Sequence, residues 1–344
     1  MRSKGRCTVH KRTKKFAVIS SVILLSAIVL SACGSTTTKT ATSTAGASAT
    51  TAVKSDKIYI PVISKGFQHQ FWQAVKQGAE KAAKEFNVEI TFEGPETETQ
   101  VDKQIEMLQA ALGKKPQAIA FAALDSKAAT PLLEKAKASK IPIIGFDSGV
   151  DSDIPITTAA TDNKAAAALA ADKMAALIGN EGEIALVVHD QTSRTGVDRR
   201  DGFTNEIKSK FPNIKIVDTQ YGGDPLKATD LAKAIFQAHP NIKGIFGSNE
   251  GAAIGVINAI TESKKDGKIV VIGFDSGKQQ MDAIKSGKMA GAVTQDPIGI
   301  GYWSVKAAVQ AIKGETVPKN IDTGFHWYDK TNIDSPDIKA LLYE

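Results

Sequence analysis

The pentapeptide Gly-Phe-Asp-Ser-Gly occurs twice in this chain, at residues 145–149 and 273–277. Each copy follows an apolar β-branched run, which predicts a buried parallel strand that ends in a loop. In open α/β sheets, ligands bind outside the carboxyl ends of the strands, so Asp147 and Asp275 lie where a ligand would bind. A single Asp there is commonly a helix cap, but two identical copies favour two similar lobes that share a cleft.

Strand and helix patterns alternate through most of the sequence. From residue 57 to residue 312, short apolar runs alternate with amphipathic segments, such as those at 71–86 and 199–210. This alternation predicts parallel sheets with helices on both faces. No long linker separates the halves, so we expect an α/β protein with two doubly wound parallel-sheet lobes joined by several short crossovers.

The charge is concentrated at the N-terminus. The 344 residues are 42% hydrophobic, which is enough for two domains. Residues 1–32 carry seven of the 43 basic residues and no acid, whereas the rest of the chain has 36 basic and 37 acidic residues. The net charge of +6 therefore does not predict a nucleic-acid partner.

The N-terminal segment has the pattern of a targeting signal. A basic stretch precedes the apolar run 16–30, which is short for a membrane span. The run ends in Leu-Ser-Ala-Cys-Gly at 30–34, which resembles a bacterial lipobox; the alternative is an ordinary signal peptide with an incidental cysteine. We expect residues 1–32 to be a lipoprotein signal peptide and Cys33 to carry the lipid. Removal of the signal also removes Cys7, so no disulfide is expected.

Residues 33–56 are then expected to be the lipidated cysteine and a flexible tether. The segment consists mostly of Ser, Thr, Ala and Gly, which cannot build an apolar core. A cysteine with two acyl chains gives lasting membrane attachment.

The first strand–helix loop, residues 64–72, combines aromatic and polar side chains. Phe71 and Trp72 follow Lys65 and His69 in this loop. Aromatic faces pack on the C–H faces of sugars, and polar groups bind sugar hydroxyls. Because aromatics at helical spacing are often core residues, we expect one of the pair in the core and one at the cleft.

Further candidates follow later strands. The polar loop 189–202 contains Asp190 and Arg199, and arginine has paired donors that suit vicinal oxygens; the alternative is a solvated loop. Asn249 and Gln295 also follow predicted strands. Asp162, by contrast, has the sequence context of a helix N-cap.

Other chemistries lack their motifs. The five histidines show no metal-ligand spacing, and the aspartates near residue 150 lack the other residues of a calcium loop. The sequence has no Gly-x-Ser-x-Gly elbow, Walker motif or dinucleotide-binding glycine pattern. We therefore expect no metal, no cofactor and no catalytic residue.

The combined motifs resemble the sugar-binding proteins of ABC importers, in the ribose-binding branch of the type I periplasmic binding fold. The resemblance extends from residue 57 to about residue 314. It is carried by Phe71-Trp72 with Gly78-Ala79, by residues 142–147, 160–163 and 199–203, by Asn249-Glu250, by residues 271–275 and by Gln295.

The resemblance implies both a ligand site and lobe boundaries. Hinges near Thr161, Gln295 and Asp322 would give an N-terminal lobe of 57–161 plus 296–322 and a C-terminal lobe of 162–295 plus 323–344. The sugar contacts would be His69, Phe71, Trp72, Asp147, Arg199, Asn249, Phe274, Asp275 and Gln295, with Lys65 and Asp190 beside them.

Two departures from the ribose binders leave the ligand open. Ser148 stands where they have a second arginine, and the aromatic residue expected near residues 222–224 is missing, with Tyr221 as the candidate replacement. Another pentose, a polyol or cyclitol, or a furanosyl signal molecule would each fit.

We expect a monomeric, extracytoplasmic lipoprotein that delivers a small sugar or polyol to an ABC permease. A sensor acting on a chemoreceptor or sensor kinase is the alternative, because one closed form could serve both. Paired carboxylates would also suit a glycoside-processing enzyme, but neighbouring arginine and amides favour hydrogen-bond acceptance over acid catalysis. A sugar-responsive repressor would need a DNA-binding segment where this chain has a signal peptide.

Overall fold

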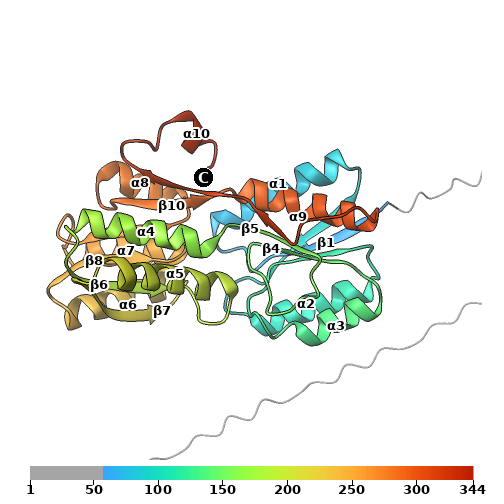
Figure 1. Cartoon of the computed structure of the whole chain (residues 1–344), viewed down its shortest axis with the longest axis horizontal. Helices are drawn as coiled ribbons and strands as arrows, with labels where there is room; N and C mark the ends of the chain where they lie inside the picture. Colours follow the sequence, from blue (N-terminus) through green and yellow to red (C-terminus); the bar gives the residue numbers. More distant parts are fainter. Residues whose placement is uncertain (1–56, 344) are drawn as a thin grey trace, which may run out of the picture. The chain divides into compact units, whose positions relative to one another are not determined.

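The computed structural model describes residues 57–343, which belong to one compact unit, Ser55–Glu344. The expected signal peptide, Cys33 and the tether lie outside the described residues. The described part contains two six-stranded sheets with helices around them (Figure 1). None of the described helices is long and apolar enough to cross a membrane.

The first lobe is built on a parallel sheet of strand order β11-β5-β4-β3-β1-β2. Its strands are β1 (Tyr59–Ile63), β2 (Glu89–Glu93), β3 (Ile119–Phe121), β4 (Ile143–Phe146), β5 (Thr157–Ala160) and β11 (Asn320–Asp322). Its helices are α1 (Gln70–Glu85), α2 (Val101–Gly113), α3 (Thr130–Ala138) and α9 (Pro297–Ile312).

The second lobe repeats this design with the order β12-β10-β9-β8-β6-β7, in which only β12 runs antiparallel to its neighbour. Its strands are β6 (Gly182–Val188), β7 (Ile214–Tyr221), β8 (Ile242–Gly247), β9 (Val270–Phe274), β10 (Gly291–Gln295) and β12 (Phe325–Asp329). Its helices are α4 (Asn163–Leu177), α5 (Arg194–Lys210), α6 (Pro225–Ala238), α7 (Glu250–Glu262), α8 (Lys278–Ser286) and α10 (Pro336–Lys339).

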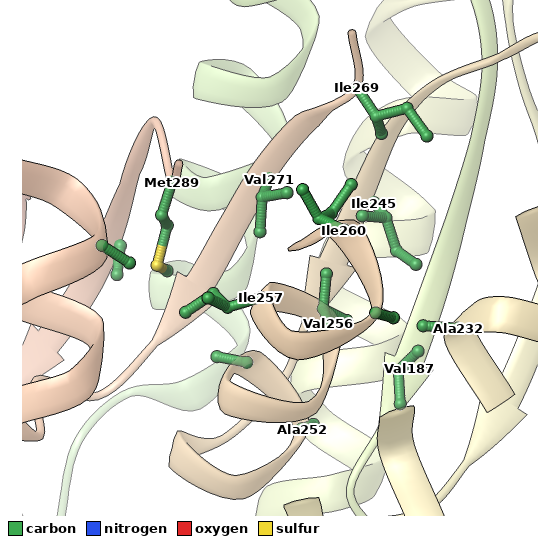
Figure 2. Close-up of a cluster of buried hydrophobic side chains, with 14 of the residues drawn as sticks. Val187, Ala232, Ile245, Ala252, Val256, Ile257, Ile260, Ile269, Val271 and Met289 are labelled. Carbon is green, nitrogen blue, oxygen red and sulfur yellow. The ribbon is translucent and has the colours of Figure 1, made fainter. Parts of the chain in front are cut away.

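The central strands are apolar on both faces, which explains their continuous hydrophobic runs. In β9, Val271 belongs to the apolar cluster under α7 and Ile272 to a separate cluster, because successive side chains point to opposite faces. Figure 2 shows Val271 in one cluster with Ile257 and Ile260 of α7. In β4, Ile143 and Ile144 divide between two clusters in the same way. The predicted buried parallel strands are confirmed.

Within the described residues the chain passes between the lobes three times. The passages follow β5, β10 and β11, so α9 returns to the first lobe after β10 and packs against α1 (Figure 1). A Cβ at Gly78 would lie 1.9 Å from the carbonyl oxygen of Ile298, and one at Gly301 would lie 1.8 Å from that of Val75. Only glycine permits so close an approach of these two helices.

The structure adds elements that the pattern did not predict. Strands β5, β11 and β12 are three to five residues long, and β12 alternates polar and apolar residues in a tail where no element was expected. Helix α5 starts at Arg194 instead of the predicted Arg199, because the Ser193 side chain caps it by accepting the N–H of Gly196 (3.1 Å). The predicted cap at Asp162 is confirmed, since its carboxylate accepts the N–H of Ala165 (3.0 Å).

Candidate ligand-binding site

The two copies of the repeated pentapeptide have matching local geometry. Asp147 and Asp275 both have positive φ angles, 52° and 76°, immediately after β4 and β9. Each donates its backbone N–H to the adjacent strand, Asp147 to Ala159 (2.9 Å) and Asp275 to Val293 (2.8 Å). Aspartate tolerates this left-handed conformation better than most residues. The repeat therefore sets two carboxylates at equivalent positions, one in each lobe.

Both carboxylates line one cavity between the lobes. The cavity contains about 280 Å³ of space between atoms, part of it open to solvent. Nine of the eleven predicted site residues line it, and Asp190 and Phe274 do not. The lining residues are Lys65, His69, Phe71, Trp72, Glu98, Asp147, His189, Thr195, Arg199, Asn249, Asp275 and Gln295.

Arg199 is held firmly by the second lobe. Its Nε donates to Asn163 Oδ1 (2.7 Å), and its Nη1 donates to the carbonyl of Ser248 (2.8 Å). The guanidinium carbon lies 3.7 Å from the ring centre of Phe274. Phe274 therefore supports Arg199 from beneath, where we expected it to line the site. The remaining guanidinium nitrogen can bind an oxygen in the cavity.

Asp275 is already engaged by protein groups. Its Oδ1 accepts a hydrogen bond from Gln295 Nε2 (2.7 Å), its Oδ2 accepts the backbone N–H of Glu250 (3.0 Å), and Arg199 Nη1 lies 3.8 Å away. Within residues 57–343, the buried Oε1 of Gln295 has no hydrogen-bond partner. A donor on a ligand would satisfy this acceptor. Asn249 caps α7 with its Oδ1, which directs its amide group to the cavity lining.

Asp147 has a different electrostatic environment from Asp275. Burial raises the pKa of Asp147 from 3.8 to about 6, although Lys65 and Arg199 act in the opposite direction. The whole residue is only 5% exposed. Ligand hydroxyl groups that donate to this carboxylate would replace the hydration that burial removed.

A charged cluster forms the cavity wall around Lys65. Lys65 Nζ hydrogen-bonds Thr195 Oγ1 (3.2 Å) and lies 3.7 Å from Glu98 and 3.9 Å from Asp190. Burial opposes the ammonium form, but the nearby carboxylates outweigh it and raise the pKa of Lys65. Asp190 therefore acts through Lys65 and does not line the cavity. Sequence reasoning missed Glu98, although it lies in the loop after a predicted strand.

Phe71 and Trp72 both line the cavity, and both belong to the apolar core of the first lobe. The expectation that one would lie in the core and one at the cleft is wrong. Their rings meet edge to face with centres 5.0 Å apart, and the indole N–H of Trp72 donates to Glu98 Oε1 (2.7 Å). Each large ring is therefore long enough to pack in the core and still reach the enclosed cavity.

His189 is a second residue that the sequence did not reveal as a site residue. It directly follows β6 and is buried, with Nδ1 2.7 Å from Ser248 Oγ and Nε2 3.1 Å from Thr195 Oγ1. Burial lowers the pKa of His189, so the ring is neutral and can exchange hydrogen bonds in either sense. His69 lines the cavity from the first lobe as predicted, with its Nε2 3.0 Å from Gln68 Nε2. Tyr221, the candidate replacement aromatic, lines a neighbouring space instead.

The site has the groups of a binding pocket for a polar neutral molecule. It combines carboxylates, guanidinium, ammonium, amides and aromatic rings. Among residues 57–343, no group of three or more His, Cys, Asp or Glu side chains could hold a metal ion.

Known proteins show the same architecture. The periplasmic binding protein domain matches residues 60–316. The D-allose-binding periplasmic protein of Escherichia coli is 30% identical over 75% of this chain and 86% of its own length. A carbohydrate transporter solute-binding protein from Agrobacterium radiobacter, solved in complex with D-arabinose, is 37% identical with a TM-score of 0.81, covering 84% of this chain and 99% of its own.

An ABC transporter solute-binding protein from Agrobacterium vitis, solved with bound D-fucose, is 35% identical with a TM-score of 0.80, covering 83% of this chain and 100% of its own. These relatives are solute-binding proteins and not enzymes. This chain belongs to the periplasmic binding protein family, with the type I fold of the ribose- and allose-binding branch.

Proposed function

We propose that this protein is the extracytoplasmic substrate-binding component of an ABC importer and binds a monosaccharide or related small polyol between its lobes. The observation that carries the proposal is the cavity, which places Asp147 of one lobe opposite Arg199 and Asp275 of the other. A ring with several hydroxyl groups can donate to the carboxylates and accept from the guanidinium and amides. The relatives named for D-allose, D-arabinose and D-fucose support the same ligand class.

The ligand contacts in this proposal are the predicted residues that line the cavity, together with Glu98, His189 and Thr195. Phe274 and Asp190 hold Arg199 and Lys65 in place. The lobes act as two bodies, 57–161 plus 296–322 and 162–295 plus 323–344, which close on the sugar by rotation at the three crossovers. Sheet membership on either side of each crossover supports these boundaries.

A thermal-shift screen tests the proposed ligand class. The panel contains D-allose, D-ribose, D-arabinose, D-fucose, D-tagatose, myo-inositol and ribitol, with L-leucine as a control that is neither a sugar nor a polyol. A compound that binds only the folded protein raises the melting temperature, by mass action. At least one monosaccharide or polyol should raise it, with calorimetric saturation at one site. No shift with any of the small sugars and polyols would contradict the proposal.

We also propose that the protein works as a monomer attached to the outer face of the membrane by a lipid on Cys33, and that it passes its ligand to the permease subunits of the importer. The support is the basic stretch, the short apolar run and the lipobox-like residues 30–34. The Ser- and Thr-rich segment that follows would let the lobes reach the permease.

A further inference from the structure

We propose that a second saccharide subsite adjoins the cavity, so that the protein also accepts a glycoside whose second group lies outside the cavity. The subsite is a separate space between the lobes, which we call the outer chamber. It measures about 810 Å³, part of it open to solvent, and its lining includes Gln68, Glu98, His189, Gln191, Tyr221 and Lys227. The inference rests on the proposed function, because it extends the same sugar site.

Glu98 and His189 separate the two spaces, since both residues line the cavity and the outer chamber. Each is fixed from behind: Glu98 accepts the indole N–H of Trp72, and His189 contacts Ser248 and Thr195. The partition therefore includes two positioned side chains, Glu98 and His189.

Lys65 offers a binding group at this partition. In the described part of the chain its ammonium makes one hydrogen bond, to Thr195 (3.2 Å). The carboxylates of Glu98 and Asp190 lie 3.7 and 3.9 Å away, beyond the usual range of a direct hydrogen bond. Because an ammonium group has three donors, a ligand oxygen at the partition can accept one of them. The oxygen that links two groups of a glycoside suits this position.

Tyr221 gives the outer chamber a fixed aromatic surface. Its half-buried ring packs against the apolar cluster that contains Phe203, and the Arg200 side chain lies near its hydroxyl. The ring also lines the outer chamber. A ring held in this way can pack against the C–H face of a sugar or against an aryl group with little loss of side-chain entropy.

The polar groups of the outer chamber favour a neutral occupant. Asp190 accepts a hydrogen bond from the Ser193 hydroxyl (2.6 Å), and Asp224 accepts two backbone N–H groups at the start of α6 (3.0 Å each). These carboxylates are already satisfied, and Gln68 is bonded to Glu98 and His69, whereas Gln191 presents an exposed amide. Amides exchange hydrogen bonds with hydroxyl groups in both senses.

The test compares free sugars with their glycosides by calorimetric titration. The probes are D-allose, D-arabinose and D-fucose, each as the free sugar and as its α- and β-4-nitrophenyl glycosides. We expect at least one glycoside to bind as tightly as its free sugar. Tyr221→Ala should lower the affinity for that glycoside by about 3- to 10-fold. The affinity for the free sugar should stay within about twofold of that of the unmodified protein.

Two further variants distinguish a lost binding contact from a loss of folding. Tyr221→Phe keeps the ring and should keep glycoside binding. Gln191→Trp, on an exposed loop, should narrow the outer chamber and lower the affinity for the glycoside alone. The matched control is Tyr302→Ala, because Tyr302 is half-buried, hydrogen-bonds Glu85 and lines neither space.

Two results would overturn the second subsite. In the first, a free sugar binds, but the affinity for every glycoside is lower than that for its free sugar by about 100-fold or more. In the second, Tyr221→Ala and Gln191→Trp lower the affinities for the free sugar and for the glycoside to the same extent. If no free sugar in the wider thermal-shift panel binds, the proposed function fails, and the second subsite fails with it.

Discussion

The carboxylate of Glu250 in the second lobe accepts the backbone N–H groups of Gln70 and Phe71 in the first lobe, each at 3.1 Å. These N–H groups open α1, whose own N-cap residue, His69, makes no side-chain capping bond. Glu250 therefore caps a helix of the opposite lobe, where the helix dipole also favours a negative charge. Its own N–H donates to Asp275, which connects this cap to the cavity.

We predict that Glu250 stabilises the arrangement in which the lobes are closed. Loss of a helix cap costs about 0.5–2 kcal/mol, so Glu250→Ala should weaken sugar binding by about 2- to 30-fold, mainly through faster dissociation. Stopped-flow and calorimetric measurements would test this. Glu262→Ala, at the exposed end of the same helix, should leave affinity unchanged, and unchanged affinity in both variants would contradict the role of Glu250.

Asp147 should make the ligand-free protein less stable at neutral pH. Its pKa is raised to about 6 by burial, so the stability it contributes is present below pH 3.8 and is lost as the pH rises through about 6. Asp147→Asn accommodates the same positive φ and removes this charge. We expect the variant to be more stable at pH 7.5 by about 1–3 kcal/mol and to bind sugar more weakly.

The measurement is denaturant unfolding of both proteins without ligand from pH 3.5 to pH 8. The stability difference should disappear towards the acidic end, because Asp147 is then protonated and uncharged in both states. A difference that stays constant across this range would show that the buried charge is not its cause.

Asp275 and Arg199 should contribute directly to affinity. A charge-assisted hydrogen bond contributes about 1.5–3 kcal/mol, so Asp275→Asn and Arg199→Ala should each weaken binding by about tenfold to a few hundredfold. Asp275→Asn should also lower stability, because its two oxygens accept from Gln295 and Glu250.

The control for these variants is Asp162→Ala, which removes only the cap of α4. It should cost about 1 kcal/mol of stability and leave affinity unchanged. Calorimetric titration and thermal melting of the three variants separate the two effects. If both Asp275→Asn and Arg199→Ala keep native affinity, the ligand does not bind at this cavity and its site must be sought elsewhere.

Lipidation of Cys33 gives a prediction about location. If Cys33 carries the proposed lipid, Cys33→Ser should release the protein from membranes, because the anchoring acyl chains would then be absent. Fractionation of cells that express each form would show the change, and mass spectrometry of the native protein should find a diacylglyceryl group on Cys33. An unmodified Cys33, or cleavage at another bond, would disprove the lipoprotein assignment.

The sequence by itself determined the alternating α/β architecture and the equivalence of two strand–loop units. Apolar β-branched runs before Asp147 and Asp275 are local signals, and they persist in the structure as β4 and β9. The cap at Asp162 is also local, since its side chain bonds a backbone group three residues later. Such features depend on residues close together in the chain.

Only the tertiary structure decided how the site is completed. Glu98 and His189 enter the cavity because loops from different lobes meet there, and Tyr221 faces the outer chamber instead of the cavity. The two aspartates of the repeat also acquire different environments, since Asp275 is bound by Gln295 while burial raises the pKa of Asp147. These differences arise from residues distant in sequence, so no local pattern could encode them.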